Sequence, residues 1–410
     1  MDFHLSKVES LLFALLRLGF KNDISSAKVA GASFENLTAG DWMACYRLAC
    51  AQGVMALAWD GVQALPKEQQ PPLGVKVPWA LAVEEYEKRY QRYCNTIEEL
   101  TQFYGQHGIA TVQMKGVGLS SYYPVPEHRE GGDIDIYTFA KRDQSRKSHE
   151  TADLKSAGDA AEKVAGESAG EYAGRVAEEV AAEDRRANEL ADELMRRQGA
   201  EVEMHSYKHS NFFYKGIPIE NHKCFLNVKH YRYGVQADDF LKRNLNPQEV
   251  LLKGCQNSIH IPSLAFNSVF VPFHAFQHYG TGISLHHLCD WYVILQKGAM
   301  KSWPKEINDK RFINAIAAFS ILSDSLLGSD SGFAEEKKAE ALAQKMLQEM
   351  LHPKFDKNVP AKGRLAVLVY KTRRFLHRYC LLKEVFEISL VQDIWKSIIA
   401  HIRQPETIFR

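Results

Sequence analysis

Two aspartates, Asp133 and Asp135, stand two residues apart in a short apolar stretch that follows a Gly-Gly pair. The run from Ile134 to Phe139 favours a β-strand, and side chains two residues apart leave the same face of a strand. Two carboxylates held this closely repel each other unless a cation lies between them, and Mg²⁺ prefers hard oxygen ligands. The pair therefore predicts a magnesium site at the N-terminal end of this strand, with Mn²⁺ as the alternative ion.

A glycine-bearing turn precedes the two aspartates. The β-favouring run from Ile109 to Met114 ends at Lys115-Gly116, and Gly118 follows. Glycines at a strand end leave backbone N–H groups unhindered, so a phosphate group can approach them, and Lys115 or Arg129 would add positive charge. A nucleoside triphosphate bound here would complete the coordination of the ion, which would offset the charge of an in-line phosphoryl displacement.

An Asp-x-Asp pair alone is common at solvated strand ends, so the longer motif matters. The pattern Lys-Gly-x-Gly-Leu-x-x-x-Tyr-Pro-x-Pro-x-x-Arg-x-x-Gly-Asp-Ile-Asp-Ile, which starts at Lys115, resembles the bacterial uncharacterised nucleotidyltransferase family of the polymerase-beta-like superfamily. The resemblance covers most of the chain outside 141–198. It implies transfer of a nucleoside monophosphate from a nucleoside triphosphate to an acceptor, with release of pyrophosphate.

The same resemblance implies roles for single residues. Asp133 and Asp135 would be catalytic metal ligands, and a third acid is expected downstream. The residues expected at the phosphates are Lys115, Gly116, Gly118 and Arg129. The acceptor, whether a small molecule, a sugar phosphate or a protein, is not indicated by any of these residues.

The third acid is predicted from the segment 195–225, which resembles the family's glycine, hairpin and acid-x-His strand. Here this strand contains Glu220-Asn-His222. Glu220 is therefore expected to be a metal ligand, or the base that takes the proton of the acceptor. Glu203, followed two residues later by His205, has the same spacing and is the alternative.

A second group of potential ligands comprises His274, His278, His286, His287 and Asp290. His274 and His278 are spaced i, i+4 on a predicted helix, as in some zinc sites. No Glu follows His274 as it would in an HExxH motif. The favoured interpretation is that these are buried histidines hydrogen-bonded to Asp290 across packed helices, because buried polar side chains usually have partners.

The predicted fold that positions these residues is α+β. A helical N-terminal unit (1–106) would precede a nucleotidyltransferase-like core with a small mixed sheet (107–232), and a helical C-terminal unit (233–410) would follow. Strands are expected at 109–114, 134–139, 201–214 and 217–223, with a hairpin turn at Lys215-Gly216. Prolines exclude a continuous helix over 65–78, and a long helix is expected over 79–106. The other predicted helices are 267–296, 311–326, 335–351 and 365–402.

One segment of the core, 141–198, is rich in Ala, Glu, Lys and Arg and has a single aromatic residue. It is interpreted as a largely solvated helical insertion without chemistry, which a short Gly/Ser linker could replace. The repulsion between the two aspartates gives a further expectation. Asp135→Asn should leave the metal-free protein as stable as the wild type or slightly more stable.

The bulk composition narrows the class of protein. The 51 Lys and Arg residues nearly balance the 50 Asp and Glu residues, which gives no support to a nucleic-acid partner. Seven cysteines without a CxxC pair are typical of reduced thiols in a cytoplasm. No run approaches the roughly 18 to 20 apolar residues of a membrane span.

A second class of function stays open, because a fold does not fix an activity. The chain would then be a catalytically inactive nucleotide-binding or regulatory protein, such as an antitoxin-like module or a partner in polysaccharide production. The retained, mutually repelling acids favour the enzyme. Nucleotide binding that survives without metal would favour the regulatory protein.

Overall fold

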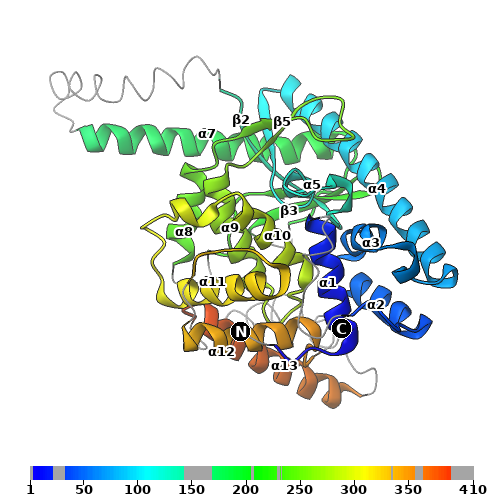
Figure 1. The fold of residues 1–410 in the computed structure, drawn as a ribbon. Coiled ribbons are helices and arrows are strands. Elements are labelled where there is room, and N and C mark those ends of the chain that lie inside the picture. The colour runs from blue at the N-terminus through cyan, green and yellow to red at the C-terminus, as the bar shows by residue number, and fades with distance from the viewer. Residues whose placement is uncertain are drawn as a thin grey trace.

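The protein, a computed structural model, has the predicted α+β fold, with a small mixed sheet between helices (Figure 1). In Figure 1, α4 runs along the right edge, and α7 extends across the top toward the left. The structure describes residues 3–21, 33–142, 169–204, 207–228, 231, 233–333, 336–355 and 363–388.

Four helices form the N-terminal part of the described chain. They are α1 (Lys7–Lys21), α2 (Ala39–Ala51), α3 (Met55–Ala64) and α4 (Leu73–Gln106). The helices α1 and α3 cross so closely that a Cβ at Gly61 would lie 2.1 Å from the Leu15 carbonyl oxygen, so only glycine fits there. The helix α4 begins six residues before the predicted start and contains Pro78. Since Pro78 lies only one turn from the helix start, it removes few backbone hydrogen bonds.

The main sheet has the strand order β1-β2-β4-β3. Its strands are β1 (Ile109–Gln113), β2 (Ile134–Ala140), β3 (His209–Tyr214) and β4 (Ile217–His222). The strands β2 and β4 are parallel, while β1 with β2 and β3 with β4 are antiparallel. Lys215 and Gly216 have φ angles of 50° and 78°, as the predicted two-residue hairpin requires.

Two further strands, β5 (Gln248–Val250) and β6 (Ile259–Ile261), form a small separate hairpin in the part predicted to be all helical. Strands of three residues carry too little alternation to be recognised from sequence. Ile259 and Ile261 are buried and join the hydrophobic cluster that also contains Ile109. The hairpin therefore extends the core beside β1.

The helix α7 (Ala169–Arg197) corrects the interpretation of 141–198 as a solvated insertion. None of the described side chains at 174–186 is buried, but Ala187, Ala191, Leu194 and Met195 are. These residues pack in the same cluster as the isoleucines of β2 and β4. The segment is therefore not a solvated spacer over its whole length, because the last three turns of α7 cover one face of the sheet.

A polar cluster fixes α7 to the two parallel strands. The amide nitrogen of Asn188 donates to Oγ1 of Thr138 on β2 at 2.9 Å and to the carbonyl oxygen of His222 on β4 at 2.8 Å. Asp192 accepts from Nδ2 of Asn221 at 2.9 Å and from Oγ of Ser210 at 2.6 Å. All these side chains are buried, so each bond replaces solvation that folding removed.

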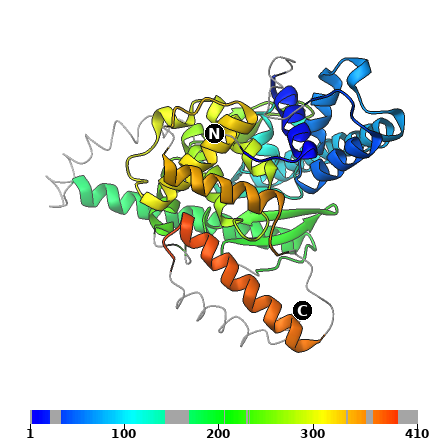
Figure 2. The same ribbon diagram turned by 60° about the horizontal axis from the view of Figure 1, so that its bottom comes forward.

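The C-terminal helices are α8 (Gly234–Arg243), α9 (Leu264–Gln277), α10 (Leu285–Gln296), α11 (Lys310–Leu322), α12 (Lys337–Leu351) and α13 (Arg364–Val385). The predicted helix 267–296 is two helices, separated by a connection with Gly280 and Gly282 at φ angles of 83° and 139°. Figure 2 shows α13 along the outside of the molecule. The residues 389–402 of the last predicted helix lie outside the described chain.

The helices of the two chain ends share one hydrophobic core. Side chains of α1, α3, α9, α10, α11 and α12 belong to a single buried cluster. Arg17 on α1 reinforces this contact, since its Nε donates to the carbonyl oxygen of Leu326 at 2.9 Å.

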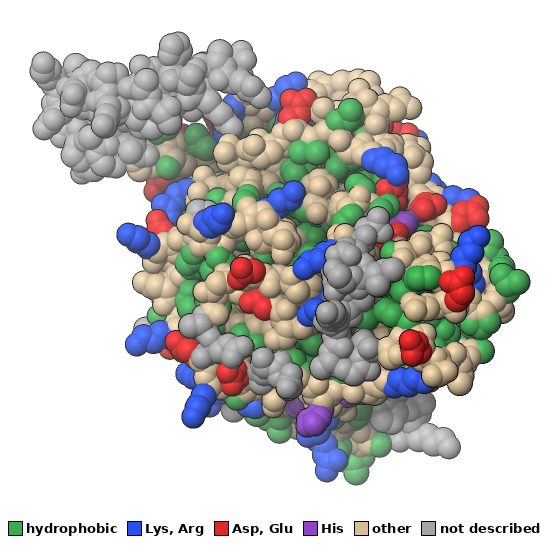
Figure 3. Space-filling view, in the orientation of Figure 1, with side chains coloured by type: hydrophobic (Ala, Val, Ile, Leu, Met, Phe, Trp, Pro, Cys, Tyr) green, Lys and Arg blue, Asp and Glu red, His purple; other side chains and the backbone are tan. Residues whose placement is uncertain are grey.

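Every described helix is too short or too polar to cross a lipid bilayer. On the described surface of one face, acidic and basic side chains are interspersed (Figure 3).

The contribution of α7 can be tested by Asn188→Ala. Loss of the amide leaves buried oxygens on β2 and β4 without their donor, so the free energy of unfolding should fall by about 2 kcal/mol. Glu189→Ala, on the exposed side of the same helix, is the matched control and should change it by less than about 0.5 kcal/mol. Urea unfolding measures both values. Equal stabilities of the two variants would contradict this role of α7.

Candidate metal and nucleotide site

The parallel pairing of β2 with β4 brings two of the predicted acids together. Asp135 and Glu220 are directly opposite each other in the register of the two strands. Because neighbouring strands are about 4.8 Å apart, their side chains leave the same face side by side. Asp135 is buried and Glu220 is partly exposed. One oxygen of each carboxylate and one ring nitrogen of His222 lie within 4.8 Å of one another.

The carboxylate of Asp135 is surrounded unequally. Its Oδ1 lies 2.7 Å from Nζ of Lys115 and 2.8 Å from Nε2 of His222. Its Oδ2 is buried and has no hydrogen-bond partner among the described residues. Burial raises the pKa of Asp135, but the charge of Lys115 and the hydrogen bond from His222 outweigh it, so the net pKa is lowered. An ionised carboxylate with one oxygen unpartnered is a natural ligand for a divalent cation.

Asp133 lies just before β2, outside the group formed by Asp135, Glu220 and His222. The charge of Asp135 and, secondly, burial raise the pKa of Asp133 to about 6. The two aspartates therefore interact, as the sequence predicts. Their repulsion raises the pKa of Asp133 and not that of Asp135, because Asp135 is paired with Lys115 and His222.

Glu220 has two histidines beside it. Its Oε2 is 3.5 Å from Nε2 of His222 and 3.7 Å from Nε2 of His209. Burial raises the pKa of Glu220. The hydrogen bond with His222 and the charge of Lys115 together outweigh this effect, so the net pKa is lowered. The lowered pKa favours the ionised, metal-binding form at neutral pH.

The alternative third acid, Glu203, lies one strand farther away. Its backbone pairs with Asn211 of β3, and Asn211 in turn pairs with Glu220 of β4. The strand β3 thus separates Glu203 from the acids, and the Glu203 side chain is exposed. His205, the second member of that motif, lies outside the described residues.

The predicted phosphate-binding turn follows β1. Gly116 has a φ of 54° and a ψ of −119°, and a Cβ there would lie 3.3 Å from the carbonyl oxygen of Asp133. The turn therefore lies against the acid-bearing strand. A Cβ at Gly118 would lie 2.2 Å from the carbonyl oxygen of Gln113. The short helix α5 (Val117–Ser120) packs so closely on β1 that this position must be glycine, whether or not it contacts a phosphate.

Three residues near the acids were not assigned from the sequence, namely His222, His209 and Lys208. His222 carried a signal, because it completes the Glu-x-His motif. His209 and Lys208 had none, since only the pairing of β3 with β4 brings them near Glu220. Burial, and secondly the charge of Lys115, lower the pKa of Lys208 to about 8.

Comparison with known proteins gives one result. The profile of a family described as an uncharacterised nucleotidyltransferase matches residues 38–151 and 183–315. The chain belongs to this family. The matched regions include the acid-bearing strands, the Lys115 turn and the helices α9 and α10. Neither a search of curated proteins nor a search of solved structures found a match.

The break in the nucleotidyltransferase match falls at 152–182. The match resumes just before Asp184, whose Oδ1 lies 2.6 Å from Nη2 of Arg142. The part of α7 that packs on the sheet is therefore within the family region. The unmatched residues 152–182 lie before it.

Arg129 occupies a different environment from the one expected of a phosphate ligand. Its Nε donates to Oδ1 of Asp290 on α10 at 3.1 Å, and its Nη2 donates to Oδ2 at 2.7 Å. Only 8% of the Arg129 side chain and 7% of the Asp290 side chain are exposed. The hydroxyl of Tyr123 also donates to Asp290 at 2.8 Å. Arg129 thus ties the site to α10.

These contacts correct the interpretation of Asp290. It is not the hydrogen-bond partner of the nearby histidines, because its carboxylate accepts from Arg129 and Tyr123 instead. A guanidinium matches a carboxylate at two points, which a histidine ring cannot do. Sequence spacing could not reveal this, since 161 residues separate Arg129 from Asp290.

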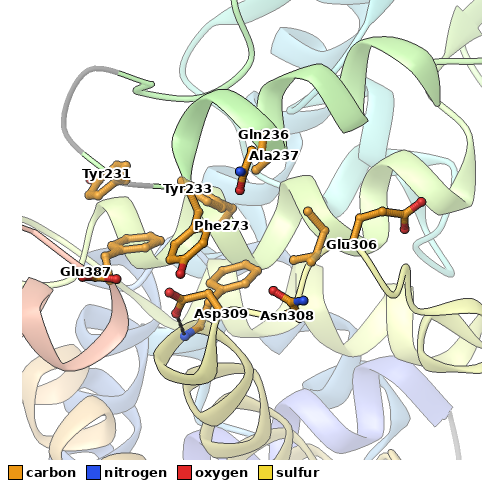
Figure 4. Close-up of a pocket in the computed structure, with 12 residues that line it drawn as sticks. Tyr231, Tyr233, Gln236, Ala237, Phe273, Glu306, Asn308, Asp309 and Glu387 are labelled. Carbon is orange, nitrogen blue, oxygen red and sulfur yellow. Dashed lines mark hydrogen bonds between the residues drawn. The ribbon is translucent and has the colours of Figure 1, made fainter. Parts of the chain in front are cut away.

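A pocket elsewhere has an empty volume of about 410 Å³ (Figure 4). Its walls include Tyr231, Tyr233, Phe273 and Phe312, and Glu306 lies at its side. None of the residues that line it belongs to the acid cluster or to the Lys115 turn. Three of these aromatic residues, Tyr231, Phe273 and Phe312, are part of the shared helical core. The pocket is therefore separate from the candidate site.

Because Asp135 is paired and Asp133 is not, we no longer expect Asp135→Asn to leave the metal-free protein as stable as the wild type. This substitution should lower the free energy of unfolding of the metal-free protein by about 2–4 kcal/mol, because Lys115 loses its buried partner. Asp133→Asn should instead raise it by about 1–2 kcal/mol at pH 7, since it removes the repelled carboxylate. Urea unfolding of both variants in EDTA measures the difference.

The gain from Asp133→Asn should also depend on pH. Since the folded-state pKa is about 6 against an ordinary 3.8, the folded wild type binds more protons than the unfolded chain between these values. Wild-type stability should therefore fall as pH rises through this window. The gain should vanish near pH 4 and be complete above about pH 7. A gain that is the same at pH 4 and pH 7 would contradict the assignment.

The Arg129–Asp290 pair makes a separate prediction. Arg129→Lys keeps the charge but loses the two-point contact, so the free energy of unfolding should fall by at least about 1 kcal/mol. Lys253→Gln is the matched control, because Lys253 is 69% exposed in its ion pair with Glu127. It should change the stability by less than about 0.5 kcal/mol. If Arg129→Lys has the same free energy of unfolding as the wild type, Arg129 does not have this structural role.

Proposed function

We propose that this protein transfers a nucleoside monophosphate from a nucleoside triphosphate to an acceptor, releases pyrophosphate, and requires Mg²⁺ or Mn²⁺. The observation that carries the proposal is the in-register placement of Asp135 beside Glu220, with a buried, unpartnered oxygen on Asp135. Membership of a nucleotidyltransferase family supports the same reaction class. The nature of the acceptor is left open.

The residues at the site fit a divalent cation. Asp135 and Glu220 would hold it, and Asp133 would join them by losing its proton more readily once a cation balances the charge of Asp135. When bound, the ion supplies charge neutralisation at the phosphate oxygens during an in-line displacement. His222, whose Nε2 already contacts Asp135, would orient that carboxylate.

Lys115 would change partners during nucleotide binding. Without a cation its Nζ neutralises Asp135. Burial lowers the pKa of Lys115, but the charges of Asp135, Asp133 and Glu220 outweigh it, so the amine stays protonated. A cation at the acids would take over the charge of Asp135, and Lys115 would then be available to a phosphate oxygen. The turn at Gly116 would bring its backbone toward the same group.

Glu220 would act as a metal ligand rather than as the base. A carboxylate with a lowered pKa binds a cation well but accepts a proton poorly. We therefore assign the ligand role to Glu220.

The proposal is tested with Glu220→Gln and the matched variant Glu203→Gln. Magnesium with a nucleoside triphosphate should raise the wild-type melting temperature by mass action. Glu220→Gln should lose most of this increase, and pyrophosphate release should fall by roughly 100-fold. Glu203→Gln should keep both within about twofold of the wild type, since it only removes the charge of an exposed side chain on the far side of β3.

Other outcomes of this experiment have definite meanings. A nucleotide-induced increase that is as large in EDTA as in magnesium would overturn the enzyme and favour the regulatory nucleotide-binding protein. Loss of the increase in Glu203→Gln alone would transfer the role of third acid to Glu203. Each of the four triphosphates is assayed separately, because the preferred base is not part of the proposal.

A further inference from the structure

Three histidines converge where α9 leads into α10. His274 lies in the last turn of α9, His278 caps that helix, and His287 lies in the first turn of α10. One ring nitrogen from each lies within 4.8 Å of the others. The ring centroids are 4.8 Å, 5.1 Å and 5.7 Å apart.

The connection between the helices makes this convergence possible. The carbonyl oxygen of His278 accepts from the backbone amides of Thr281, Gly282 and Ile283, which closes a tight turn. Gly280 and Gly282 adopt positive φ angles in it. The turn reverses the chain, so the end of one helix lies beside the start of the next. The three rings are therefore held by packed backbone rather than by a long loop.

The hydrogen bonds of the fold do not explain the cluster. Asp290, the nearest acid in sequence, is occupied by Arg129 and Tyr123. Among the described residues, no side chain or backbone group hydrogen-bonds to the rings of His274 and His278. The ring of His287 is oriented by Ser284, whose backbone amide donates to Nδ1 at 3.2 Å. Nε2 of His287 has no hydrogen-bond partner among the described residues, and it becomes the third ligand nitrogen when the ring proton is on Nδ1, where Oγ of Ser284 at 3.4 Å can accept it.

The protonation state suits metal binding. Burial lowers the pKa values of His274, His278 and His287, and neighbouring charges, including that of Lys115, lower them further. The pKa of His278 falls to about 4. Neutral imidazole is the form that ligates a metal. At neutral pH the site would need to release no protons from imidazolium groups before it binds an ion.

We propose that His274, His278 and His287 bind one divalent transition-metal ion of the zinc class. Nitrogen ligands select such an ion over Mg²⁺, which prefers the oxygen ligands at Asp135 and Glu220. Three protein ligands leave a fourth position for water or an anion, as in zinc sites that interact with substrates. The nearby charge of Lys115 favours an anion there. The inference goes beyond the nucleotidyl transfer proposed above and does not depend on it.

The test uses the full chain, stripped of metal with EDTA and dialysed into excess Mg²⁺, which competes for the oxygen-rich site. Co²⁺ is added as a spectroscopic substitute for Zn²⁺, because four-coordinate Co²⁺ absorbs visible light strongly. The wild type should show this absorption at one equivalent of Co²⁺, and one equivalent of Zn²⁺ should abolish it. His278→Gln and His274→Gln should each weaken Co²⁺ binding by at least roughly 100-fold.

Two controls locate the ion. His352→Gln alters a histidine whose side chain is 59% exposed, and Glu220→Gln alters the acid site. Both should bind Co²⁺ like the wild type. Absorption that is lost in Glu220→Gln but kept in His278→Gln would overturn the proposal, as would a wild type without any absorption. Circular dichroism of the metal-free variants checks folding, and two independent histidine variants guard against a single misfolded protein.

Discussion

The parallel pairing of β2 with β4 is the contact on which the candidate site depends. Parallel neighbours cannot be joined by a short turn, so the chain between them must cross over the sheet. The helix α7 lies on this connection and packs on one face of the two strands. Asn188 bonds to both strands at once, which fixes their register. A shift by one residue would turn Glu220 to the face covered by α7.

The sheet consequently has two different faces. Alternate residues of β2 and β4 are isoleucines that join α7 and α4 in one hydrophobic cluster. Tyr137, on the same side as Asp135, packs on Phe225 in the other cluster, which includes the C-terminal helices. The carboxylates thus lie at the end of the face that meets α9 and α10. This placement brings histidines from a distant part of the chain within electrostatic reach of Lys115.

Charge within the site is balanced around a single carboxylate. Asp135 is held ionised by an ammonium group and an imidazole on one oxygen, while Asp133 carries the repulsion. The two acids therefore differ in charge state, because the pKa of Asp135 is lowered while that of Asp133 is raised to about 6. The Arg129–Asp290 pair attaches this arrangement to α10 without a contact to Asp133 or Asp135.

The sequence by itself determined the parts that depend on neighbouring residues. The apolar run after the Gly-Gly pair indicated the strand β2 that carries Asp135, and Lys215-Gly216 specified the hairpin that positions Glu220. The motif around Lys115 indicated the family, which the profile match confirms. These features are readable because they are set by backbone geometry over a few residues.

Only the tertiary structure decided which distant groups meet. The order of the strands places Glu220, and not Glu203, next to Asp135. It showed that the last three turns of α7, at the end of a charge-rich segment, belong to the core, since one narrow stripe of buried residues packs on the sheet. It also gave Asp290 a partner 161 residues away in place of the adjacent histidines. Such choices follow from packing over the whole chain, which local propensity does not encode.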